Sequence, residues 1–277
     1  MPPSLVTDVP AATLRAIDLV TWAAPKAPTA PKAERTAADR RRTADPVAVD
    51  VLFEEVQAFF AEDAAKARTG ARADLDALGR VIERTALALE SSDVMLGLAC
   101  ATTSRPADPV ALHRARALVF ALATGLQLGY AGARLVDLGR TAARVDTGTP
   151  RRAPALDDTA LRSTSECFAR LLGPTVAGRG LSPYAALHGM VRGRHGAHAP
   201  SALRALIGAL GCFPPGTLVR LNSGDTARVI SVNRRHPLRP GLEVVRDMQG
   251  QRLTEPRRVD LAEAPFLHIV GPLEGEA

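Results

Sequence analysis

Several residue types and patterns are scarce in this 277-residue sequence, and each scarcity removes a class of protein. The three cysteines, Cys100, Cys167 and Cys212, are far apart and form no CxxC pair, so neither a disulfide framework nor a zinc knuckle is indicated. The first residues lack the basic stretch and apolar core of a signal peptide. The most apolar stretch, residues 115–133, is interrupted by glycine and polar residues and predicts no membrane span. We therefore expect a cytoplasmic protein with no membrane partner.

Lysine and aromatic residues are also rare. Only three of the 35 basic residues are lysine (Lys26, Lys32 and Lys66), which leaves 32 arginines behind the net charge of +6. An arginine excess can serve phosphate or nucleic-acid binding. Here the arginines are spread along the whole sequence, and with 4% aromatic residues there is no row of rings on which bases would stack. A nucleic-acid partner is therefore not favoured.

What is present indicates four regions. Residues 1–22 form an N-terminal segment with a short apolar patch, which either docks elsewhere or adds an edge strand. Residues 23–45 combine alanine–proline punctuation with the Arg40–Arg42 run and no large apolar residue, and are predicted to be a disordered linker. Residues 46–211 are expected to be a helical domain, and residues 212–277 a small β-module.

Helix starts are marked by an acid or a serine followed by proline, the usual order of an N-cap and a first helical residue. We expect a first helix to open at Asp45-Pro46, a second to span about 72–101 and a third to open at Asp108-Pro109. A fourth is expected near 134–145 and a fifth near 157–172, a sixth should open at Ser182-Pro183, and a seventh should run from about 200 to Gly211. Seven successive helices predict an all-α bundle. The third is apolar nearly all round, which places it at the centre with His113 pointing inward.

The pattern changes after Gly211. Alternating residues predict strands at Thr217–Leu221, through Val229–Val232, at Leu242–Val245 and at Phe266–Val270, with turns at 222–225 and at Gln249-Gly250. The fold class predicted is thus mainly α, a helical bundle followed by a small antiparallel β-module that packs on the bundle because it is too small to bury much alone.

The runs FPPGTLVRLNSGDTARVISVN, HPLRPGLEVVRD, RRVDL (257–261) and FLHIV resemble the C-terminal extension of bacterial HD-GYP proteins, members of the HD phosphohydrolase superfamily. Upstream, RGLSPYAALHGM and LQLGYAGARLVDLGRTAARVDTG resemble stretches of the helical domain that precedes that extension. The likeness covers roughly residues 95–272 and implies that the predicted bundle is HD-domain-like. It implies a bacterial signalling protein whose family hydrolyses cyclic di-GMP with two or three iron or manganese ions.

Carried onto this sequence, the resemblance implies metal positions at His113, Asp146 and Glu166. Val145 stands where the histidine of the HD doublet belongs and has no lone pair to offer, and Ala169 replaces an acidic residue. Between Gly148 and Leu161 only about twelve residues replace several helices and the GYP loop. We expect the three positions to be vestigial, held by hydrogen bonds, with no catalytic residue and no cofactor.

The function expected is therefore an inactive HD-GYP-like interaction or regulatory protein. One alternative is a reduced metallohydrolase that uses iron or manganese at His113, Asp146 and Glu166 on cyclic di-GMP or a smaller phosphoester. Another is weak nucleic-acid binding through the arginines of the β-module. A protein partner is expected, and a homodimer through Phe53, Phe59 and Phe60 is an option; cyclic di-GMP binding is not favoured.

Overall fold

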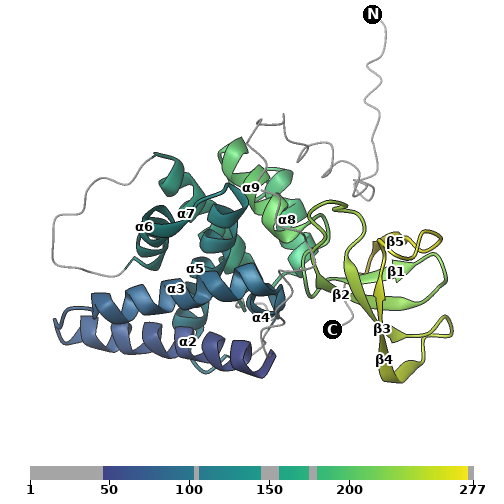
Figure 1. The fold of residues 1–277 in the computed structure, drawn as a ribbon, viewed down its shortest axis with the longest axis horizontal. Helices are drawn as coiled ribbons and strands as arrows, with labels where there is room; N and C mark the ends of the chain where they lie inside the picture. The colour runs from purple at the N-terminus through teal and green to yellow at the C-terminus, as the bar shows by residue number, and fades with distance from the viewer. Residues whose placement is uncertain (1–45, 103–105, 145–155, 175–179, 274–277) are drawn as a thin grey trace, which may run out of the picture.

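The computed structural model describes residues 46–102, 106–144, 156–174 and 180–273 (Figure 1). The apolar patch at residues 14–22 and the linker at 23–45 lie outside this range. The helices are α2 (Pro46–Arg68), α3 (Leu75–Ser91), α4 (Val94–Cys100), α5 (Pro109–Gln127), α6 (Gly132–Ala143), α7 (Leu156–Leu172), α8 (Pro183–Val191) and α9 (Pro200–Leu210). The strands are β1 (Leu218–Leu221), β2 (Thr226–Ser231), β3 (Gly241–Arg246), β4 (Arg252–Asp260) and β5 (Ile269–Pro272). The predicted fold class, mainly α with a C-terminal antiparallel sheet, is confirmed.

Helix α5 is the centre of the bundle, as its apolar sequence predicted. Asp108 caps its start by accepting hydrogen bonds from the amides of Val110 and Ala111, each at 2.9 Å, and Pro109 occupies the first turn. An unbroken run from Ala115 to Gly125 is buried, and α5 contacts α2, α3, α4, α6, α7 and α9. A helix buried on all faces has to be apolar all round, which is what the composition of α5 provides.

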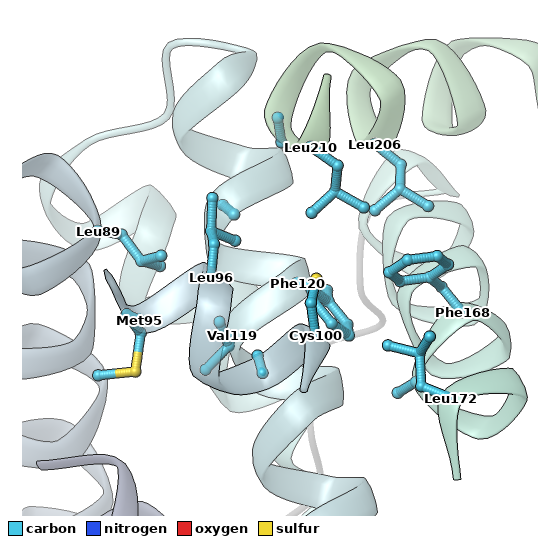
Figure 2. Close-up of a cluster of buried hydrophobic side chains, with 14 of the residues drawn as sticks. Leu89, Met95, Leu96, Cys100, Val119, Phe120, Phe168, Leu172, Leu206 and Leu210 are labelled. Atoms are coloured by element: carbon cyan, nitrogen blue, oxygen red, sulfur yellow. The ribbon is translucent and has the colours of Figure 1, made fainter. Parts of the chain in front are cut away.

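The core between α4, α5, α7 and α9 is shown in Figure 2. The rings of Phe120 on α5 and Phe168 on α7 meet edge to face, with centroids 4.9 Å apart. Leu206 and Leu210 of α9 lie beside them and are fully buried. These contacts hold α7 against α5. They therefore also set the position of Glu166 on α7 relative to His113 on α5.

The helix predicted over about 72–101 is in fact two helices. Ser92 adopts an extended conformation (φ −159°, ψ 162°), which ends α3 at Ser91, and Asp93 begins α4. The apolar periodicity continues across the break because both helices contribute to one core, with Leu89, Met95 and Leu96 buried. Periodicity therefore did not reveal the break, whereas the polar run at Ser91–Asp93 marks it.

The five strands form one antiparallel sheet in the order β4-β3-β2-β1-β5. Its inner face consists of small and branched apolar residues that belong to the same core as the helices: Val219, Leu221, Ala227, Val229, Leu242 and Val244. Asp93, at the start of α4, accepts a hydrogen bond of 2.8 Å from the amide of Val232 just after β2. The sheet thus packs on the bundle, as predicted, at the end of the molecule away from the α2–α3 loop (Figure 1).

Strand β4 was not predicted, and β5 begins later than expected. β4 has the sequence RLTEPRRVD and is exposed along most of its length. It is an edge strand, where charge and proline are tolerated because one side needs no ladder partner. β5 covers Ile269–Pro272, whereas Phe266, expected in this strand, lies outside it with 90% of its surface exposed.

No membrane-crossing candidate is found among the helices just described, since none combines sufficient length with sufficient apolar character.

Candidate metal centre

Two of the three predicted metal positions lie on packed helices. His113 is on α5, one turn after its start, and Glu166 is on the facing helix α7. Both side chains are partly buried, and the Glu166 carboxylate acts electrostatically on the imidazole of His113. Asp146 and Val145 lie outside the described residues, so the assembly of the three positions stays a prediction.

The Glu166 carboxylate is already engaged by arginine. Arg162, one turn earlier on α7, donates from Nη1 to both carboxylate oxygens at 2.9 Å each. The guanidinium Nε of Arg144 lies 3.6 Å from Glu166 Oε1. Two cations against one carboxylate leave its negative charge more than neutralised, so a metal ion would have to displace an arginine to use this ligand.

Arg144 reaches Glu166 from an unusual backbone position. It is the C-cap of α6 and has φ 50° and ψ 36°, the left-handed region where glycine is the common residue. Among the described residues it is the only non-glycine with positive φ. A conformation of this kind costs of the order of 1 kcal/mol, and it ends α6 next to the predicted site.

His113 is held in its neutral form by its surroundings. Burial is the main cause of its lowered pKa, and Arg170, Arg116 and Arg114 lower it further, whereas Glu166 acts in the opposite direction. A neutral imidazole has a lone pair for a metal ion, but three nearby guanidinium groups repel a divalent cation. Over the described ranges, no three His, Cys, Asp or Glu side chains are grouped so as to hold a metal ion.

One of these three arginines, Arg116, has a structural role that the sequence did not lead us to expect. Arg116 is the largest fully buried side chain of the described residues, with 1% of its surface exposed. Its Nη1 donates to the carbonyl of Leu172 at 3.3 Å and its Nη2 donates to the carbonyl of Ala101, so one cation joins the C-terminal ends of α7 and α4. The negative ends of two helix dipoles stabilise this cation. The available signal was a single arginine inside an apolar run.

A second group of polar side chains lies where the loop after α8 returns to α7. The carbonyl of His195 is 3.7 Å from Cys167 Sγ, and the His195 ring lies against Gly189, where a Cβ would come within 2.5 Å of its Nε2. Burial lowers the pKa of His198, whose buried Nε2 has no hydrogen-bond partner among the described residues. This loop is therefore packed on the bundle by its histidines, while Arg192 and Arg194 are exposed.

The arginines of the β-module divide into two groups. Arg239 ties down a loop by donating to the carbonyls of Leu261 (2.7 Å), Ala264 and Pro265, and Arg257 lies 3.7 Å from Asp225. Others stand on the exposed face, where β-sheet register places Glu243 opposite both Arg228 and Arg258. These arginines thus either hold a loop in place or lie close to an acidic residue.

Comparison with known proteins finds one similarity, in the β-module. Residues 218–277 match the family model of a KOW domain associated with HD domain. This match suggests an HD-domain-containing protein. Searches among curated proteins and among solved structures found no match.

Proposed function

We propose that this protein is a catalytically inactive HD-GYP-like protein that acts as an interaction or regulatory module in bacterial signalling. The observation that carries the proposal is the engagement of Glu166 by Arg162 and Arg144. The KOW match in residues 218–277 supports the coarser part, an HD-domain protein. The helical domain at 46–211, the β-module at 212–277 and a cytoplasmic location are part of the same proposal.

Charge and sequence both favour inactivity. A hydrolase of this class needs several anionic or imidazole ligands around two or three ions, because the ions must lower the pKa of a bound water. Among the described residues, the carboxylate that acts on the pKa of His113 is that of Glu166, which is neutralised by arginine, and Arg114, Arg116 and Arg170 add positive charge around the imidazole. Val145 at the doublet position removes a further ligand.

The test is metal analysis of the purified full chain, combined with hydrolysis and binding assays for cyclic di-GMP. Inactivity predicts no stoichiometric iron or manganese and no turnover after incubation with either metal. Stoichiometric metal together with hydrolysis that is lost in His113→Ala would overturn the proposal. Binding without hydrolysis would identify a sensor of the nucleotide and keep the chain non-catalytic.

A reduced metallohydrolase is the alternative that a specific observation favours. Burial lowers the pKa of His113, which favours an imidazole with a free lone pair, and the Glu166 carboxylate is close enough to act on that pKa. This alternative predicts manganese-dependent release of phosphate from a small phosphoester by the wild type. The activity should be lost in Glu166→Gln and raised in Arg162→Gln, which frees the carboxylate; no activity in any of the three proteins excludes it.

Nucleic-acid binding would rest on the exposed arginines of the sheet. With Glu243 between Arg228 and Arg258, the outer face lacks an uninterrupted positive stripe. The alternative predicts an affinity that falls steeply with salt, because each neutralised phosphate releases counterions. Absence of binding to single- or double-stranded DNA and RNA at low salt would remove it.

A further inference from the structure

Helices α3 and α6 leave an open groove between them. The helices touch where Ile82 packs against Gly139, so closely that a Cβ on the glycine would lie 2.8 Å from Ile82 Cγ2. Beside this contact is a hollow of about 620 Å³. Its floor includes buried Ile82 and Leu135, and its wall includes Leu87, a leucine with 62% of its surface exposed. An apolar hollow with an exposed leucine at its edge is typical of a binding groove.

The border of the groove is acidic. Glu83 and Glu90 line it from α3, and Asp137 lines it from α6. The one basic residue of the lining, Arg140, lies 4.0 Å from Asp137, one turn away on α6. The groove therefore carries a net negative charge and favours an occupant that combines large apolar side chains with basic neighbours.

We propose that the groove between α3 and α6 binds the N-terminal segment of the same chain, through its apolar residues at positions 14–22. Five large apolar residues occur there within nine positions: Leu14, Ile17, Leu19, Val20 and Trp22. The following 23 residues contain six basic and three acidic residues, a charge opposite to that of the groove. Apolar content and charge thus match the floor and the border respectively. The proposal is independent of whether the chain is an enzyme.

The start of α2, to which the N-terminal segment is joined, is close enough to the groove for residues 14–22 to reach it. Arg84 of α3 pairs with Glu55 of α2, and Asp74 and Ala77 lie beside Lys66 at the other end of α2. The two helices are therefore antiparallel, and α2 begins next to the last turns of α3, the part that lines the groove. Twenty-three linker residues can span up to roughly 80 Å, whereas α3, with 17 residues, is only about 25 Å long. Any point of the groove is within reach.

The test uses Trp22, the only tryptophan of the chain, as a reporter. In the full-length protein we expect Trp22 to emit at shorter wavelength than in denaturant and to be protected from acrylamide. Leu87→Glu should move the emission to longer wavelength and abolish the protection. Val110→Glu is the matched control, because Val110 is equally exposed (60%) and lies at the start of α5, outside the groove; it should change neither quantity.

A second variant keeps the test independent of any effect of Leu87→Glu on folding, which far-UV circular dichroism would monitor. Glu83→Gln combined with Glu90→Gln should weaken the protection and reduce its sensitivity to salt. A wild-type Trp22 that is quenched as readily as in denaturant, or protection that survives Leu87→Glu, would overturn the proposal. Protection that is lost on dilution, together with a dimer in light scattering, would place the segment in the groove of a second copy and likewise overturn it.

Discussion

Arg162 donates from a single nitrogen, Nη1, to both carboxylate oxygens of Glu166, one helical turn further along α7. Both side chains are about four-fifths buried, so water screens the pair only partly. The contact gives the Glu166 carboxylate a structural role within α7. It also predicts a measurable coupling free energy between the two residues.

A double-mutant cycle with Arg162→Ala and Glu166→Ala is expected to give a coupling free energy of about 1 kcal/mol, because a partly buried ion pair at this spacing exceeds an exposed one. Urea unfolding of the two single variants and the double variant measures it. The control is the same cycle for Lys66 and Glu62, an exposed pair at the same spacing, which should give less. A coupling near zero for Arg162 and Glu166 would contradict the arrangement described.

Arg116→Ala is expected to lower the free energy of unfolding by about 3 kcal/mol, since it leaves a cavity and removes the donors from two helix-end carbonyls. Arg116→Lys should be intermediate, because an ammonium cannot match the two directions of the guanidinium. Thermal unfolding followed by circular dichroism compares them. Arg80→Ala, on the exposed face of α3, should change stability by less than about 0.5 kcal/mol. Equal effects of the two alanine variants would be inconsistent with the buried role of Arg116.

Stability should decrease as the pH falls below the ordinary histidine pKa of 6.5. The folded-state pKa values of His113 and His198 are lowered, chiefly by burial. Between the lowered and the ordinary pKa the unfolded chain binds more protons than the folded chain, so the free energy of unfolding rises with pH in this window and is progressively lost toward lower pH.

Urea unfolding at several pH values around 6 measures this dependence. His113→Gln, which cannot be protonated, should flatten it, and His236→Gln, at an exposed position, serves as the control and should leave it unchanged. A wild-type stability that increases on acidification through this window would show that the histidines gain rather than lose proton affinity on folding.

Asp93→Ala is expected to loosen the sheet from the bundle and to cost about 1 kcal/mol, because the partly buried amide of Val232 loses its acceptor. Hydrogen exchange of β2 and β3 should become faster than that of α5. Arg234→Ala breaks only the longer contact at 3.4 Å and is the control for loss of charge alone; it should have little effect. Unchanged exchange of β2 in Asp93→Ala would show that the sheet is held by other contacts.

The sequence allowed the central helix and most helix starts to be predicted, since Asp108-Pro109 and Ser182-Pro183 combine two local signals. It did not reveal the end of α3 at Ser91, because Leu89 and Met95 both face the core and keep the periodicity intact. It did not reveal β4, because an edge strand is selected for charge and proline more than for alternation.

For the candidate site, the resemblance proposed the positions His113 and Glu166, whose role as metal ligands stays a prediction, but it could not predict their environment. That His113 and Glu166 lie on facing helices follows from the packing of α5 on α7, which no local pattern encodes. The i, i+4 spacing of Arg162 and Glu166 is visible in the sequence and would have indicated the pair. The approach of Arg144 depends on the left-handed end of α6 and has no sequence signal beyond proximity.

Phe213 stacks on Tyr184 with ring centroids 5.7 Å apart, and Tyr184 stacks in turn on His188. Phe213 belongs to the segment that follows α9, whereas the other two rings belong to α8. A chain ending at Gly211 would therefore lose one ring of the stack and the amide that satisfies Asp93. The helical part purified by itself would therefore expose apolar surface that the β-module covers in the whole chain.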